Sequence, residues 1–270
     1  MKVTIVVDNI EHAGIPGEWG FCAYIEQNGK KLLLDTGASN LFADNAEKLN
    51  IDLKDVDFAV LSHAHYDHAN GMGKFFEINE KAPFYLQEGC GENCYFKKGF
   101  VRKYIGIPKG ITKRYQDRIK YVSGICPIAE GIYLVSHSTP HLEQIGKKEM
   151  MYQKTKLGWK PDNFCHEQSL VLDTDSGLVI FNSCSHGGVV NIINEVKAAF
   201  PNKKITALIG GFHIFNHPEE EIRELAKLIK ETGIERIYTG HCSKERGYRI
   251  LREELGDMAG QFYVGMELEF

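Results

Sequence analysis

The sequence has no apolar segment long enough to cross a membrane and no run of basic residues. A membrane-spanning helix takes about 20 consecutive apolar residues, and no stretch of this chain approaches that length. Its 32 lysines and arginines are interspersed with 36 aspartates and glutamates, for a formal net charge of −4. With no basic stripe and no apolar span, the sequence predicts neither nucleic acid nor a membrane as a partner.

Several familiar signatures are also missing. We find no P-loop, no G-x-S-x-G elbow and no dinucleotide fingerprint. The N-terminal run Met1–Asp8 is too short in its apolar part for a signal peptide, and we interpret it as a strand. Seven cysteines are an odd number in a chain of 270 residues, which has no need of disulfide staples. Cys90 and Cys94 lack a second close pair to complete a structural zinc site, so we predict free thiols and a reducing cytoplasm.

The most informative feature that is present is the run His63-Ala64-His65-Tyr66-Asp67-His68. It follows the apolar run Phe58–Leu61. Two histidines at alternate positions of an extended segment point the same way, while Asp67 and His68 would swing toward a second position on a turn into a helix. Imidazole and carboxylate together suit zinc and, less selectively, iron, manganese or cobalt. The plain alternative is a solvated histidine-rich loop, but this density of ligand types after an apolar strand favours two neighbouring metal ions.

Strand patterns dominate the start of the chain, and strands alternate with helices in the second half. Asn28-Gly29 between two apolar runs is typical of a hairpin turn. Pro218 followed by three glutamates is typical of a helix start, and Gly233 of a helix end. The predicted strands are Val3–Val7, Phe21–Glu26, Lys31–Asp35, Phe58–Leu61, Ile132–Ser136, Ser169–Thr174, Leu178–Asn182, Ile205–Ile209, Arg236–Thr239 and a period-2 strand Phe262–Phe270. The predicted helices are one capped by Ser39 and running to about Leu49, one starting near Asn70, Val189–Phe200, one after Pro218 with the apolar face Ile222, Leu225, Leu228 and Ile229, and Lys244–Leu255.

This order predicts an α/β protein with two mixed β-sheets face to face and helices on both outer faces. No linker divides the chain, so we expect a single domain over residues 1–270. Residues from about 88 to 127 are rich in Lys, Arg, Tyr and Gly and have poor periodicity. We interpret them as a partly helical insertion that covers the site, with a solvated surface excursion as the alternative.

Three strands of the second half also end in residues that can bind metal. Cys184-Ser185-His186, Gly211-Phe212-His213 and Gly240-His241-Cys242 each follow an apolar strand. A histidine at a strand end is often only a cap or a core residue. Three of them, added to the first cluster, are enough to ligate two ions if the strand ends share one crevice.

Taken together, these segments resemble the metallo-β-lactamase superfamily over nearly the whole chain. The H-x-H-x-D-H run carries the resemblance, with Asp35-Thr36-Gly37 one hairpin earlier and the single histidines later. Within the superfamily, Cys184–Gly188, Ile209–His213 and Gly240–Cys242 are similar to the metal-dependent hydrolases of β-lactamase superfamily II. Some members of that branch are described as a dihydropterin-(ribofuranosyl)aminobenzene phosphate synthase.

The resemblance implies an αββα sandwich and assigns roles position by position. His63, His65 and His186 would hold one metal ion; Asp67, His68 and His241 would hold the other. Cys184 stands where many members place a bridging Asp, so it is a further candidate ligand. His141 is the rival of His186 for the third position, because hydrolases of this fold often have a histidine there.

The implied reaction is hydrolysis of a small ester, lactone or phosphate ester by a metal-bound hydroxide. Asp67 would be a ligand and proton acceptor, and His213 would donate a proton or bind an anionic group. The expected cofactors are two divalent ions, zinc first, then iron or manganese. The expected partner is an anionic small molecule, and a homo-oligomer stays open. The alternatives are a pterin-related synthase or iron-dependent oxidoreductase on the same scaffold, or a metal-binding protein without turnover.

Overall fold

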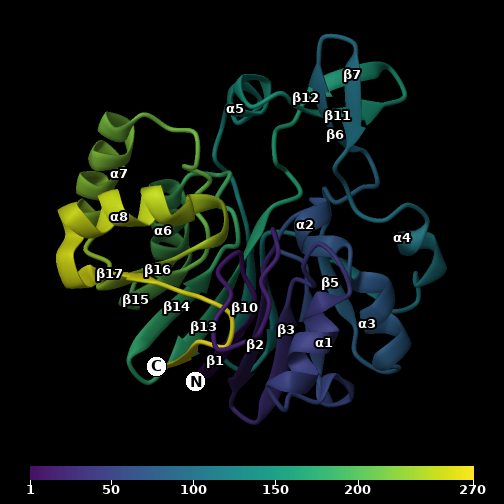
Figure 1. Ribbon diagram of the computed structural model, residues 1–270, viewed down its shortest axis with the longest axis horizontal. Coiled ribbons are helices and arrows are strands. Elements are labelled where there is room, and N and C mark those ends of the chain that lie inside the picture. The colour runs from purple at the N-terminus through teal and green to yellow at the C-terminus, as the bar shows by residue number, and fades with distance from the viewer.

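Two seven-stranded mixed sheets lie face to face, with helices on both outer faces (Figure 1). The computed structural model describes all residues 1–270. The first sheet has the order β18-β1-β2-β3-β4-β5-β8 and is built largely from the N-terminal part of the chain. Its strands are β1 (Lys2–Val7), β2 (Cys22–Gln27), β3 (Lys30–Leu34), β4 (Phe58–Val60), β5 (Phe84–Gln87), β8 (Ile119–Val122) and β18 (Glu267–Glu269).

The second sheet has the order β17-β16-β15-β14-β13-β10-β9. Strands β14, β15, β16 and β17 run parallel to one another, so the loops that follow β14, β15 and β16 leave from the same edge. The strands are β9 (Ile125–Ala129), β10 (Ile132–Ser136), β13 (Gln168–Thr174), β14 (Gly177–Phe181), β15 (Ile205–Ile209), β16 (Arg236–Thr239) and β17 (Ala259–Gln261).

Alternation along the strands builds three apolar layers. In β3, Leu32 and Leu34 face the second sheet while Leu33 faces the helices outside. In β14, Val179 and Phe181 face the first sheet, and Ile180 lies under the helices on the other side. Because side chains point to opposite faces at successive positions, each strand is buried on both faces. The predicted αββα arrangement is therefore confirmed.

Helices α1 and α3 cover the first sheet, and α6, α7 and α8 cover the second (Figure 1). Ser39 helps to start α1, since its hydroxyl accepts the Leu41 N–H at 3.0 Å. None of the helices is both long enough and apolar enough to span a membrane. They are α1 (Leu41–Lys48), α2 (Tyr66–Ala69), α3 (Met72–Ile78), α4 (Ile111–Arg114), α5 (Glu143–Lys148), α6 (Val189–Ala199), α7 (Glu219–Glu231) and α8 (Lys244–Leu255).

A third, four-stranded sheet stands beyond the edge of the sandwich that carries α2, away from both termini (Figure 1). Its order β12-β11-β6-β7 joins two distant segments: β6 (Cys94–Lys98) and β7 (Val101–Tyr104) with β11 (Met151–Thr155) and β12 (Gly158–Pro161). The segment 88–127 contains one four-residue helix, α4, and its last strands, β8 and part of β9, belong to the main sheets. The predicted insertion therefore contributes strands more than helix. Half of the third sheet, β11 and β12, comes from residues to which the sequence patterns assigned no element.

Two details of the predicted elements were wrong. Phe262–Phe270 does not form one strand, because Gly265 turns the chain at φ +83° between β17 and β18, which lie in different sheets. Phe262 and Val264 are nevertheless fully buried. On α7, Leu228 is 40% exposed and Ala226 is buried instead, because the buried stripe follows the line of Ile222, Ala226 and Ile229.

Candidate metal centre

The loop after β4 delivers four of the predicted donors to the edge of the sandwich. His63 and His65 are buried, and their ring centroids lie 4.7 Å apart. Helix α2 begins at Tyr66, which carries Asp67 and His68 round to a second position. The expected turn into a helix is therefore present, and it leaves the ring of His68 4.1 Å from that of His63.

The second sheet brings the other donors to the same place. Cys184 and His186 follow β14, His213 follows β15 and His241 follows β16. The ring of His186 lies 5.1 Å from that of His63 and 5.0 Å from that of His65, between centroids. His241 lies 5.0 Å from His68 in the same measure.

These side chains form two groups of potential ligands that adjoin at Cys184. One ligand atom each from His63, His65 and His186 falls within 4.8 Å of the others. In the second group, Asp67 Oδ2 lies 3.9 Å from His68 Nε2 and 3.6 Å from His241 Nε2.

Cys184 Sγ lies between the groups. It is 3.3 Å from His68 Nε2 and 3.5 Å from the sulfur of Cys242. The sulfur of Cys184 also belongs to potential ligand groups with His63 and with His186. Burial raises the pKa of the Cys184 thiol, so a bound cation is the natural partner for its thiolate.

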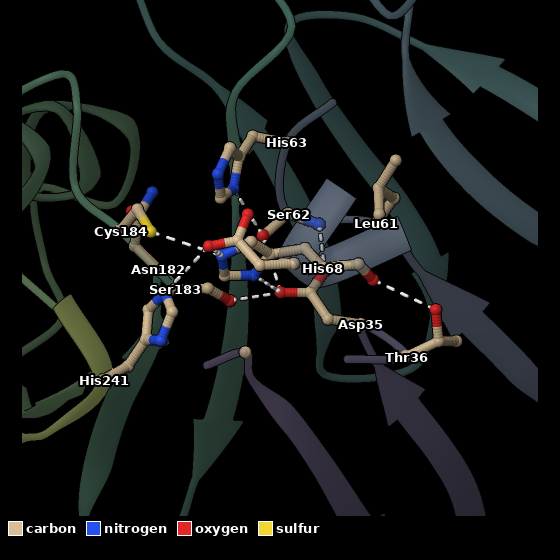
Figure 2. A network of polar contacts seen from close by, with 12 residues as sticks. Asp35, Thr36, Leu61, Ser62, His63, His68, Asn182, Ser183, Cys184 and His241 are labelled. Carbon is tan, nitrogen blue, oxygen red and sulfur yellow. Dashed lines mark hydrogen bonds and ion pairs between the residues drawn. The ribbon is translucent and has the colours of Figure 1, made fainter. Parts of the chain in front are cut away.

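Asp35 holds the first-half imidazoles from behind (Figure 2). Its Oδ2 lies 2.7 Å from His68 Nδ1 and accepts the hydroxyls of Ser62 and Ser183 at 2.7 and 2.6 Å. Its Oδ1 accepts the Ser62 N–H at 2.7 Å. Because the Ser62 hydroxyl donates to Asp35, it can only accept from His63 Nδ1, which lies 2.9 Å away. Both rings therefore carry a proton on Nδ1. Nε2 of His63 has no partner, and Nε2 of His68 faces the sulfur of Cys184.

The second-half donors are anchored at their backbones. Glu167 accepts the N–H groups of His186 and Gly187 at 2.8 and 2.7 Å. Asp8 accepts the His241 N–H at 2.7 Å, and Asn9 donates to the His241 carbonyl at 2.9 Å. Burial raises the pKa of Asp8 to about 7. The backbone that leads from each strand to His186 or His241 is thus held by hydrogen bonds, even where the imidazole ring is not.

The donor atoms suit a metal ion because four of the buried ring nitrogens have no hydrogen-bond partner. Nε2 of His63, His65, His186 and His241 are all buried and have no hydrogen-bond partner. Burial lowers the pKa of His65 and of His241 to about 3, and it lowers those of His63 and His186 well below the usual value. Neutral imidazoles with buried free lone pairs are costly without a partner and are the form that binds metal.

His213 lies at the same edge but is held differently. Its Nε2 is 3.2 Å from Glu149 Oε2, and its ring lies 4.4 Å from that of His186. Burial alone would lower the pKa of His213, but hydrogen bonds with Cys242 and Glu149 raise it to about 10. The ring can therefore carry a positive charge beside the donor cluster.

His141, the rival of His186, lies elsewhere. Its side chain is 75% exposed, and Nδ1 lies 3.7 Å from the carboxylate of Glu143. His186 is buried against Phe164, with the two rings parallel within 4° and 4.3 Å apart. The geometry therefore places His186, and not His141, beside His63 and His65.

Four residues around the donors received no role from the sequence. Asp35 and Cys242 were visible only as parts of the Asp-Thr-Gly and Gly-His-Cys segments, and Glu167 had no motif of its own. His166 was missed too: its Nδ1 accepts the Ala64 N–H at 3.1 Å, and its Nε2 lies 3.2 Å from Asp162. Only the position of Asp35 at a strand end beside the histidine strand gave a usable signal.

A pocket of about 370 Å³ opens over the donors. Aromatic and apolar side chains form most of its wall, and Lys103 is its only basic residue other than histidine. Phe96, Lys103 and Ile105 come from the predicted insertion, which therefore does line the site. The aromatic members of the wall are Trp19, Tyr66, Phe96 and Phe215.

Comparison with known proteins agrees with this geometry. The family model described as the metallo-beta-lactamase superfamily matches residues 19–148. A curated protein of Methanocaldococcus jannaschii, named 7,8-dihydropterin-6-methyl-4-(beta-D-ribofuranosyl)-aminobenzene-5'-phosphate synthase, is 27% identical over 93% of this chain and 88% of its own length.

Solved structures extend the likeness to the whole chain. Tm1679, a metal-dependent hydrolase of the beta-lactamase superfamily, superposes with a TM-score of 0.85 and 27% identity over 100% of this chain and 99% of its own. Zn(2+)-bound PqqB of Methylobacterium extorquens shares the fold, with a TM-score of 0.61 and 12% identity over 100% of both chains. With its αββα sandwich and its histidine-rich edge, the chain belongs to the metallo-β-lactamase superfamily.

Proposed function

We propose that the protein is a metal-dependent hydrolase that binds two divalent ions and cleaves an ester-type bond in a small anionic molecule. The observation that carries the proposal is the set of four buried imidazole nitrogens without a partner. Three of the four rings, those of His65, His186 and His241, line one pocket. Nitrogen, carboxylate and thiolate donors in this mixture suit zinc best, with iron or manganese as the next candidates.

The two groups of donors suggest how the ions would be held. His63, His65 and His186 would hold the first ion, and Asp67, His68 and His241 the second. Cys184 lies within reach of both and would take the position between them. Ions held by these residues would lower the pKa of coordinated water and would polarise a carbonyl or phosphoryl oxygen.

The surrounding residues would supply the rest of the chemistry. Asp67 orients the reacting groups and accepts a proton, since its carboxylate faces the pocket beside His241. His213 donates a hydrogen bond or a proton to the leaving group, because Glu149 fixes its ring at the pocket wall. The aromatic wall excludes water, which strengthens each of these interactions.

The test compares His65→Ala with His141→Ala. His65 is a buried member of the donor group, whereas His141 is exposed and outside it. His65→Ala should lose bound metal, measured by elemental analysis, and should hydrolyse aryl phosphodiesters and lactones roughly 100-fold more slowly or worse. His141→Ala should keep both properties. Turnover by His65→Ala without bound metal would contradict a metal-dependent reaction. If the unmodified protein binds its full complement of metal but hydrolyses no ester, a metal-binding protein without turnover is favoured.

A pterin-related synthase is the second candidate, because the named relative from Methanocaldococcus jannaschii spans 93% of this chain. The aromatic pocket would accept a flat heterocycle. The two functions separate by product. A synthase would yield the dihydropterin-(ribofuranosyl)aminobenzene phosphate for which the relative is named, which mass spectrometry detects as one new species. A hydrolase would release only the two fragments of an ester.

A further inference from the structure

Lys244 has a backbone conformation that lysine rarely adopts. It follows His241-Cys242-Ser243 and begins α8, with φ +54° and ψ 172°. This region of φ and ψ is almost restricted to glycine, because a Cβ crowds the neighbouring backbone. Strain of this kind persists where the surrounding structure enforces it, and it often marks a functional position.

Neither packing nor ion pairing explains a lysine at this position. The residue is exposed, so no core depends on its side chain. No carboxylate lies within 4.0 Å of its ammonium group. Two glutamates line the adjoining hollow, but they are engaged elsewhere: Glu18 accepts from Ala38 and Ser39, and Glu245 accepts from Gln261.

The ammonium group is instead placed at the mouth of the metal pocket. Its nitrogen lies 5.2 Å from the ring centroid of Trp19 and 5.3 Å from that of Phe215. Both rings line the pocket over the donors. Lys244 also lines a hollow of about 330 Å³ that shares Trp19 and His241 with that pocket. A positive charge without an anion therefore lies beside two neighbouring rings, in a hollow that His241 also lines.

We propose that Lys244 binds an anionic group of the substrate, and that the substrate carries a planar ring. The ring would pack against Trp19 and Phe215, and its phosphate or carboxylate group would lie in the hollow beside Lys244. This inference rests on the proposed function, since it takes the pocket over the donors as the substrate site. Lys244 is thus a specificity-determining residue.

Lys103 offers a useful contrast on the opposite wall. It extends from β7 in an ordinary strand, lines the pocket directly, and lies 5.8 Å from the ring centroid of Tyr66. It has no ion-pair partner either, yet its backbone is unstrained. A lysine can therefore reach this pocket without strain, so the strained position of Lys244 is specific to the side of the pocket next to His241.

The test uses the metal-loaded protein, with Lys244→Gly and Lys244→Gln as variants and Lys156→Gln as the control. Lys156 is exposed in the turn between β11 and β12. Phenylphosphonate, which has a P–C bond in place of an ester bond, is the probe, and phenol is its uncharged counterpart. Both Lys244 variants should bind phenylphosphonate about ten-fold more weakly by calorimetry, while phenol binding stays unchanged. Lys244→Gly should also raise the midpoint of thermal unfolding by roughly 2–6 °C, because glycine relieves the backbone strain.

Binding decides the proposal. Unchanged affinity for phenylphosphonate in Lys244→Gln would overturn it, as would an equal loss for phenol or for the Lys156→Gln control. A stabilised Lys244→Gly with full affinity would show that the strain serves something other than this anion. The measurement records binding and not turnover, so it is independent of the hydrolysis test. If the Lys244 variants bind the probe more weakly but the unmodified protein hydrolyses no ester, then the proposed hydrolysis is wrong and the role of Lys244 still stands.

Discussion

Two of the three imidazoles from the first half of the chain, His63 and His68, are held by their rings, whereas His186 from the second half is held by its backbone. His68 is bound at Nδ1 by Asp35, and His63 is bound at Nδ1 by Ser62, which is itself bound to Asp35. His186 has no hydrogen bond on either ring nitrogen and depends on stacking against Phe164. His241 is intermediate, with Nδ1 3.3 Å from Asn9 Oδ1.

This difference has a chemical consequence. A ring bound at Nδ1 by a carboxylate has its proton and its orientation set before a cation arrives. A ring anchored only through its backbone can still rotate or change its tautomer. We therefore infer that the first half provides a preorganised set of donors, and that binding of the ion fixes the ring of His186. The predictions below test that division.

The largest effect is expected for Asp35→Asn. An amide has one acceptor oxygen, so its NH2 group would face either the Ser62 N–H at the Oδ1 position or the three donors at the Oδ2 position. Metal affinity should fall roughly 10- to 100-fold, and the free energy of unfolding by about 2–4 kcal/mol, because buried donors lose their acceptor. Chelator competition and urea unfolding measure the two effects.

Asp8→Asn is the matched control from the second half. Asp8 accepts two backbone N–H groups, those of Ile10 and His241, and touches no ring. Each oxygen accepts one of them, so an asparagine keeps only one of the two bonds. Because neither bond reaches a ring, we expect a much smaller loss of metal affinity than for Asp35→Asn. Equal losses in the two variants would remove the distinction between ring-held and backbone-held donors.

Glu167→Gln should have a moderate effect that falls on stability more than on metal binding. Glu167 accepts the N–H groups of His186 and Gly187 with separate oxygens, and glutamine can satisfy only one of them. The free energy of unfolding should fall by about 1–3 kcal/mol, with less than a ten-fold change in metal affinity. A large loss of metal with unchanged stability would show that Glu167 acts on the ring of His186 after all.

The sequence predicted the first-half part of the site better than the second-half part. The first-half donors are contiguous, so six residues revealed four of them and the turn that separates them. The strand ends were predictable because apolar runs and turn residues are local signals. The contact between Ser183 and Asp35 spans 148 positions and has no local signature. The same is true of the Phe164 ring that supports His186.

The four-stranded sheet shows the limit for the fold. Cys94 pairs with Gln153 and Tyr95 with Tyr152, across more than fifty residues. Its strands are short, and charged and aromatic residues occupy its outer face, so neither half has a clear period-2 pattern. Lys244 is similar: the sequence placed a helix start there correctly, but nothing in it indicated the unusual backbone.

The smallest effect is expected from Glu195, which supports the second-half loop from farthest away. Its carboxylate lies 2.8 Å from His137 Nδ1 and also accepts from Ser138, and His137 in turn contacts Asn182, which accepts the Ser185 N–H. Burial alone would raise the pKa of Glu195, but the bonds to His137 and Ser138 lower it overall.

A carboxyl group whose pKa is lowered in the folded state stabilises the fold at pH values above its unfolded pKa of 4.5. That stabilisation is lost as the pH falls through the folded pKa. Glu195→Gln should therefore be less stable than the wild type by about 1 kcal/mol at pH 7, and the gap should narrow below pH 4.5 in urea unfolding at a series of pH values. A gap that stays constant to pH 3 would mean that packing, and not the charge of Glu195, holds this end of the loop.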